Sequence, residues 1–190
     1  MEREFKVGGG KIRLVVGDLT KQDDVAVLVN AANPQLAGGG GVDGALHAAA
    51  GPAVLQECQA WIAEHGELGA GRVMRTSAGA LPNTAIYHTV GPVYRGGYHG
   101  EYVALEHCYA RSLAMLRAEG LRSIAFPSIS TGAYGFPLDR AAYVALSTTI
   151  RELTETPDTI DEIRLVAFDE AQGAEYAAIF DEVVRTQTGT

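Results

Sequence analysis

Short apolar runs rich in β-branched residues alternate along this chain with longer stretches of helical periodicity. Five runs have strand character and end at glycine, proline or polar residues, namely 11–17, 25–30, 84–90, 123–129 and 162–168. Two shorter runs, 3–7 and 71–77, are further strand candidates. Apolar residues recur at helical spacing over 42–50, 52–65, 103–120, 138–155 and 173–186.

Strands that are apolar throughout are typical of a sheet covered by helices on both faces. The alternation of strands and helices therefore predicts an α/β fold. No internal repeat, low-complexity tail or linker interrupts the pattern, and 190 residues are enough to bury a core. We expect a single domain over 1–190.

Unusual residues follow four of the predicted strands. In open α/β sheets, ligands bind in the crevice beyond the carboxyl ends of the strands. The residues in those places are AANPQLAGGGGVDG after 25–30, STGAYGFP after 123–129, Asp18-Leu19-Thr20 after 11–17, and Asp169 after 162–168. Their convergence predicts a binding site at one edge of the sheet.

Composition limits the kind of ligand. The chain has 15 basic and 23 acidic residues, a net charge of −8, and no run of lysine or arginine. That balance disfavours a nucleic-acid surface, which needs clustered cations. Glycine is abundant at 23 residues, so we expect an anionic ligand to be held by backbone amides rather than by salt bridges.

Cysteine usage and hydropathy exclude other classes of protein. Cys58 and Cys108 show no metal-ligand spacing, which predicts neither a disulfide framework nor a zinc site. The amino terminus lacks a secretory signal and no apolar stretch is long enough to span a bilayer. We expect a cytoplasmic protein without membrane contact and, because no heptad seam is present, a monomer.

The stretch 38–47, GGGGVDGALH, matches the G-x-G-x-x-G dinucleotide fingerprint. In that fingerprint the glycines follow their strand directly; here AANPQLA intervenes, which disfavours a nicotinamide-dependent oxidoreductase. Two interpretations remain, a flexible surface loop or an anion site at the start of the helix that follows. Asn30, Asn33 and Asp43 bracket the glycines with groups suited to bonding hydroxyls.

The second loop, 130–137, is also a candidate anion site. Its small residues leave successive N–H groups uncovered, and such a nest of amides binds phosphate; the alternative is an ordinary glycine turn. Two amide cradles that face one crevice suit a diphosphate better than a single phosphate.

Four further side chains each have two interpretations. Asp18 is either a helix N-cap or an acceptor for an exocyclic amine. Phe168 is either a core residue or a stacking platform for a base. His47 and His88 are more typical of structural residues than of catalysts.

Taken together, these residues resemble a known family, the macro domain, in its MacroD-like hydrolase branch. The matches come in order and span nearly the whole chain: Gly17-Asp18-Leu19-Thr20, NAAN at 30–33, GGGGVDGALH at 38–47, AAGP at 49–52, HTVGP at 88–92 and STGAYGFP at 130–137. The resemblance implies a three-layer α/β/α sandwich around a central mixed, mostly parallel sheet that binds ADP-ribose.

The resemblance also implies roles for individual residues. At the adenine end, Asp18 would accept from the amino group, the Leu19 amide would meet a ring nitrogen, and Phe168 with Asp169 would border the base or its ribose. The groups that would hold the two phosphates are the amides of Gly41 and Val42 and the turn Ser130, Thr131, Gly132, Ala133 and Tyr134. Tyr134 would also flank the distal ribose, whose hydroxyls Asn33 would bond, and Asp43 would be the catalytic carboxylate.

The expected activity is hydrolysis without a cofactor or a metal. We expect removal of mono-ADP-ribose from acidic protein side chains and deacetylation of O-acetyl-ADP-ribose, by Asp43 and Asn33 with an ordered water. The proton of that water passes either to Asp43 or to a substrate phosphate. A non-catalytic reader of ADP-ribosylated proteins is the main alternative. RNA-end phosphoryl substrates are a further alternative, which the acidic surface disfavours.

Two related branches are disfavoured. Gln56-Glu57-Cys58 lacks the adjacent glutamates of the poly-ADP-ribose glycohydrolase signature, and the Cys/His sets of zinc-dependent relatives are not found in the sequence.

Overall fold

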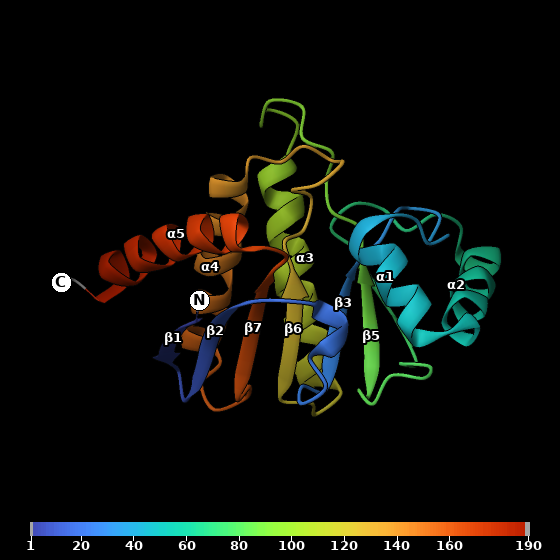
Figure 1. Cartoon of the computed structure of the whole chain (residues 1–190), viewed down its shortest axis with the longest axis horizontal. Helices are drawn as coiled ribbons and strands as arrows, with labels where there is room; N and C mark the ends of the chain where they lie inside the picture. The colour runs from blue at the N-terminus through green and yellow to red at the C-terminus, as the bar shows by residue number, and fades with distance from the viewer. Residues whose placement is uncertain (1, 189–190) are drawn as a thin grey trace.

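The computed structural model describes residues 2–188, with side chains up to residue 186, and within that range the chain forms seven strands, five α-helices and one short 3₁₀ helix (Figure 1). In chain order these are β1 (Glu2–Val7), β2 (Gly10–Val16), the 3₁₀ helix η1 (Leu19–Lys21), β3 (Val27–Ala31), α1 (Gly41–Ala50), α2 (Pro52–His65), β4 (Val73–Thr76), β5 (Ala85–Thr89), α3 (Glu101–Ala118), β6 (Ser123–Pro127), α4 (Leu138–Glu155), β7 (Glu162–Ala167) and α5 (Glu170–Thr188).

All seven strands join one sheet in the order β1-β2-β7-β6-β3-β5-β4. The five inner strands are parallel to one another, and the two edge strands, β1 and β4, pair antiparallel with their neighbours. The prediction of a mixed, mostly parallel sheet is therefore confirmed.

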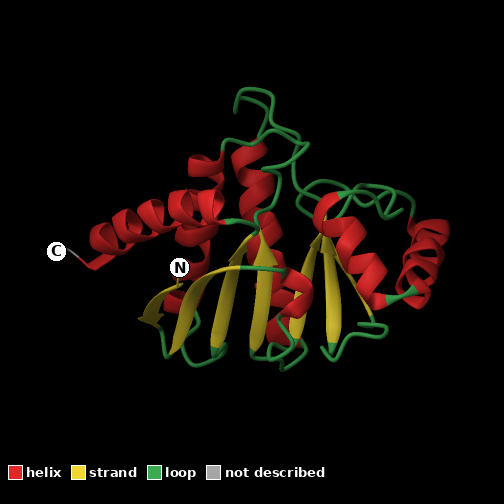
Figure 2. Ribbon diagram, in the orientation of Figure 1, coloured by secondary structure: helices red, strands yellow, loops and turns green. Residues whose placement is uncertain are grey.

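Strand periodicity explains the layers on the two faces of the sheet. Successive side chains point to opposite faces, so Val27 and Val29 of β3 join a core cluster with α3, α4 and α5, while Leu28 packs with α1 and α2. In β5, Tyr87 and Ile86 divide in the same way. Figure 2 shows helices on both sides of the sheet, and the predicted three-layer α/β/α sandwich is confirmed.

Each predicted strand and helix forms, with shifts of a few residues at some ends. β3 begins at Val27 rather than at residue 25, because the Val25 carbonyl accepts from Asn83 Nδ2 at 2.8 Å. α5 begins at Glu170 rather than at residue 173. There, Asp169 Oδ1 accepts from the backbone N–H of Gln172 at 2.8 Å and caps the first turn.

Cys58 and Cys108 are both buried and free, as expected. Among the described residues, no helix is long and apolar enough to cross a bilayer.

Candidate active site

The predicted site residues lie on loops at one edge of the sheet. The neighbours β2, β7, β6, β3 and β5 run parallel, so their carboxyl ends meet at the same edge. The loops that follow them gather at the upper edge in Figure 1. The structure thus brings together the four loops that the sequence singled out, together with the loop that follows β5.

The glycine-rich stretch forms a shaped turn that leads directly into α1. Gly38 and Gly41 have φ values of 74° and 60°, a left-handed conformation that favours glycine. A Cβ at Gly44 would lie 2.3 Å from the carbonyl oxygen of Gly39. Gly40 is the N-cap of α1 and makes no side-chain capping bond. The N–H groups of the first turn lie at the positive end of the helix, an arrangement that attracts anions.

Asn33 braces this turn. Its Nδ2 donates to the carbonyl oxygen of Gly38 at 2.8 Å, and its Oδ1 accepts from the backbone N–H of Ala37 at 3.1 Å. These two bonds fix the shape of the turn, which favours the anion-site interpretation over a flexible surface loop. A carboxamide has two N–H groups and two lone pairs, so Asn33 keeps one of each for a ligand.

Asp43 lies in the first turn of α1 and is only 7% exposed. Its Oδ1 accepts from Asn30 Nδ2 at 2.7 Å and lies 3.4 Å from His47 Nε2. A Cβ placed on Gly39 would be 3.4 Å from Asp43 Oδ2 and 3.8 Å from Asn33 Nδ2, so both side chains lie beside Gly39. Burial raises the pKa of Asp43, while the Asn30 hydrogen bond and the His47 charge act in the opposite direction.

A buried hydrogen-bond network holds Asn30 from the other side. Asn30 Nδ2 also lies 3.1 Å from His88 Nδ1, its register partner on β5, and His88 Nε2 lies 2.9 Å from Thr76 Oγ1. Because Thr76 donates its hydroxyl proton to the carbonyl oxygen of Ser77, it accepts from Nε2–H, and Nδ1 is left as the acceptor for Asn30. Burial lowers the pKa of His88 to about 3, so the ring stays neutral.

This network corrects one expectation and supports another. Asn30 was expected to bond ligand hydroxyls, but it is fully buried and orients Asp43 instead. His88 is a hydrogen-bonded core residue, as expected. Strand parity was the missed signal: Asn30 and His88 alternate with Val29 and Tyr87 and so point toward α1 and α2.

The structure also assembles His47, Cys58 and His88, whose ligand atoms all lie within 4.8 Å of one another. The sequence did not predict this cluster, because its members come from α1, α2 and β5 and show no ligand spacing. Both ring nitrogens of His88 take part in hydrogen bonds, and burial raises the pKa of the Cys58 thiol to about 12. These properties favour a packing and hydrogen-bonding role over metal ligation.

The turn after β6 forms the second cradle. Ser130 has a φ of 66°, which is rare outside glycine, and within residues 2–188 its buried Oγ has no hydrogen-bond partner. The turn is fixed by bonds from Phe136 N to the carbonyl oxygen of Ser130 and from Thr131 Oγ1 to that of Ser128. No acceptor among the described residues bonds the backbone N–H groups of Gly132 and Ala133, so they remain for an anion.

The residues expected at the adenine end follow β2 and β7, two neighbouring strands. Asp18 caps η1, and its Oδ1 accepts from the N–H and the hydroxyl of Thr20, both at 2.8 Å. Phe168 is 76% exposed, so its interpretation as a core residue is wrong and a stacking surface is left. The Leu19 side chain is buried, and Asp169 is exposed beside Phe168.

Fold and site together define a three-layer α/β protein with turns of uncovered amides after the neighbouring strands β3 and β6, and a buried carboxylate on the helix that follows the first turn. The macro domain family model matches residues 29–145, and the chain belongs to that family.

Relatives with names and structures agree with this assignment. The chain is 53% identical over 161 residues to a macro domain-containing protein of Listeria monocytogenes, a match that covers 84% of this chain and 91% of the relative. It is 45% identical over 177 residues to an O-acetyl-ADP-ribose deacetylase of Citrobacter koseri, covering 93% of this chain and 97% of the relative. It is also similar to the solved structure of an Oceanobacillus iheyensis macrodomain with ADP, with a TM-score of 0.94, 38% identity and 98% of each chain covered.

Proposed function

We propose that this protein is a cytoplasmic, monomeric hydrolase that binds ADP-ribose, removes mono-ADP-ribose from acidic protein side chains and deacetylates O-acetyl-ADP-ribose. The observation that carries this proposal is the placement of Asp43 and Asn33 together beside Gly39, at the turn that leads into α1, with a second turn of uncovered amides after the neighbouring strand β6. The deacetylase relative and the structural neighbour with bound ADP support the choice of ligand.

In this proposal the ligand lies across the ends of the parallel strands. Adenine stacks on Phe168 and donates to Asp18, at the ends of β7 and β2. The two phosphates accept hydrogen bonds from the amides of α1 and from the turn after β6, because unpaired N–H groups at a helix start attract negative charge. The distal ribose then reaches Asn33 and Asp43.

Ester hydrolysis at this position needs one water and one proton acceptor. The water oxygen adds to the acyl carbon of the ester, and the bond between that carbon and the ribose oxygen breaks. A proton of the water ends on the ribose oxygen, which leaves a free hydroxyl on the ribose and a carboxylic acid. Burial raises the pKa of Asp43, so its carboxylate accepts a proton more readily than an ordinary one. Asn30 holds Oδ1, so Oδ2, the oxygen beside Gly39, is the atom that faces the water. Besides the water and the substrate, the proposed steps use only groups of the protein.

The test is to replace the carboxylate while keeping the cradle. Asp43→Ala should abolish release of ADP-ribose from an automodified protein in single-turnover assays, yet retain most of the affinity for ADP-ribose measured by calorimetry. Asp139→Ala is the matched control, because Asp139 is also in the first turn of a helix, α4, and is exposed. Full turnover by Asp43→Ala would refute the catalytic assignment. Binding of ADP-ribose without turnover by the wild-type protein would identify a reader instead.

A further inference from the structure

The loop between β5 and α3 lies at the ligand-binding edge, and the proposed function gives it no part. The proposed ligand runs along the strand order β2, β7, β6, β3, with its distal ribose at the end of β3. The next strand in that order is β5. The loop that follows β5, residues 90–100, therefore begins beside the end of the site at which the esterified group lies.

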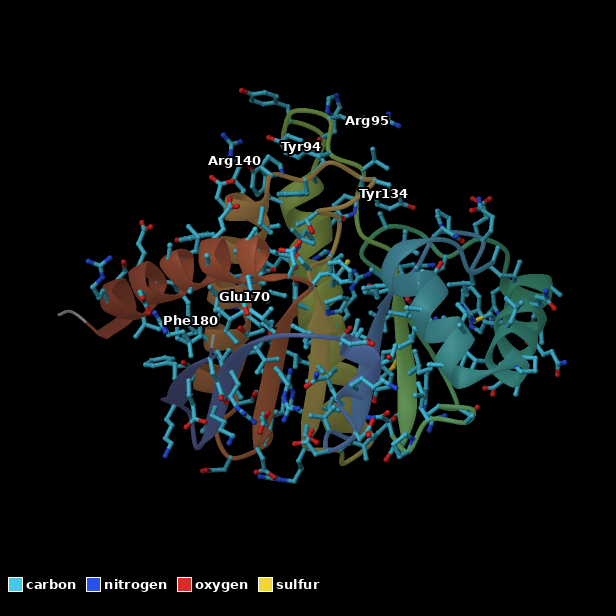
Figure 3. The ribbon with its side chains drawn as sticks, in the orientation of Figure 1. Tyr94, Arg95, Tyr134, Arg140, Glu170 and Phe180 are labelled. Atoms are coloured by element: carbon cyan, nitrogen blue, oxygen red, sulfur yellow. The ribbon has the colours of Figure 1, made fainter. Side chains whose placement is uncertain are left out.

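This loop is attached directly to the second amide turn. The backbone N–H of Tyr94 donates to the carbonyl oxygen of Tyr134 at 2.8 Å, and the Tyr94 ring lies 4.9 Å from that of Phe136. At the base of the loop, a Cβ on Gly91 would lie 2.1 Å from Ser130 Oγ. In Figure 3, Tyr94 and Arg95 project at the top of the molecule, with Tyr134 beneath them. The loop is thus an extension of the site wall.

One buried carboxylate holds the outer part of the loop in a defined shape. Glu101 is 3% exposed, and its oxygens accept from the backbone N–H groups of Arg95 at 2.9 Å, Gly97 at 3.2 Å and His99 at 2.6 Å. Hydrogen bonds to a charged carboxylate are stronger than those between neutral groups, so three of them hold the loop firmly. They fix the loop before any partner arrives, which lowers the entropy cost of binding.

The side chains that this loop presents suit a polypeptide. Tyr98 is 92% exposed, and among the described residues the Arg95 guanidinium makes no hydrogen bond or ion pair. Tyrosine and arginine are the residue types that contribute most to protein interfaces. Arg95 is therefore an exposed positive charge on a chain of net charge −8, which favours an acidic partner.

We propose that the β5–α3 loop receives the acceptor polypeptide of an ADP-ribosylated protein, with Arg95 contacting acidic residues near the modified side chain and Tyr98 packing against the peptide. This inference rests on the proposed function and adds a substrate-recognition surface to it. An acetyl group is too small to extend from the ribose to the loop tip, so the loop distinguishes protein-linked from small-ester substrates.

The test compares two substrates in the same protein. A double variant, Arg95→Ala with Tyr98→Ala, is assayed for kcat/KM on a glutamate-automodified ADP-ribosyltransferase and on O-acetyl-ADP-ribose. Loss of two interface contacts should lower kcat/KM for the protein substrate about tenfold, with the small ester and the affinity for free ADP-ribose unchanged. The matched control is Arg72→Ala with Tyr143→Ala, two exposed residues that lie just before β4 and on α4.

The outcomes separate this inference from the proposed function. If the double variant keeps the wild-type kcat/KM for each substrate, the inference is overturned. An equal loss of kcat/KM on both substrates also overturns it and would place the loop in ADP-ribose binding. Wild-type protein that turns over neither substrate refutes the proposed function instead. A selective loss on the protein substrate, absent from the control, supports the inference.

Discussion

Acidification should destabilise this protein through a single buried residue, His88. The ring is fully buried, accepts from Asn30 at Nδ1 and donates to Thr76 from Nε2. Protonation would convert Nδ1 from an acceptor to a donor and place a charge inside the core. Burial, and to a smaller extent the charge of His47, therefore lowers the pKa of His88 from 6.5 to about 3.

The sign and the size follow from proton linkage. Between these two pKa values the unfolded chain binds a proton that the folded protein does not, so the free energy of unfolding falls as the pH falls. The slope approaches about 1.4 kcal/mol per pH unit, so acidification from pH 7.5 to 4.5 removes roughly 2–3 kcal/mol. The pKa values of Asp24 and Glu101 are lowered to about 2. The stability that these two carboxylates contribute to the folded state is therefore lost mainly at lower pH. Asp43, with a raised pKa, acts in the opposite direction.

The assay is chemical denaturation between about pH 7.5 and pH 4.5 for the wild type and two variants. Wild-type protein and His65→Gln, which changes a histidine with 47% side-chain exposure, should both show the full loss. His88→Gln should be less stable at pH 7.5 but lose roughly 2–3 kcal/mol less across the range. The same pH dependence in His88→Gln and the wild type would refute the reasoning. An NMR titration of His88 in the wild type gives a second measurement, and titration near 6.5 would refute it as well.

Two further predictions concern the site. Gly44→Ala should weaken ADP-ribose binding about 5- to 150-fold, since its Cβ would lie 2.3 Å from the carbonyl oxygen of Gly39 and displace the turn at a cost of about 1–3 kcal/mol; Gly69→Ala, where a Cβ meets only a side-chain atom at 3.8 Å, is the control in calorimetry. Prolonged chelation should leave turnover unchanged, because protein groups alone carry the proposed steps; lost activity that zinc restores would instead make the cluster of His47, Cys58 and His88 a metal site.

The sequence by itself determined the elements and the composition of the loops. Apolar alternation and helical spacing are local signals, and each is set by which residues within a few positions need burial. The glycines of 38–41 and the small residues after β6 are readable in the same way, because a left-handed φ or an uncovered amide is a property of a few adjacent residues. For this reason the two turns were predictable one loop at a time, and so was the helix after the glycines, predicted from residue 42 and found from Gly41.

Only the tertiary structure decided which loops are neighbours and what each buried polar group bonds. Asn30 and His88 are 58 residues apart and pair because β3 lies beside β5, an order that long-range burial sets and local periodicity does not contain. The same pairing turned Asn30 from an expected ligand contact into the residue that orients Asp43. The sequence leaves open whether Phe168 is a core or a surface residue. It lies at the surface because it follows the exposed end of β7. Patterns along a chain specify faces and turns, whereas contacts between distant segments depend on the strand order, which is chosen by the whole core at once.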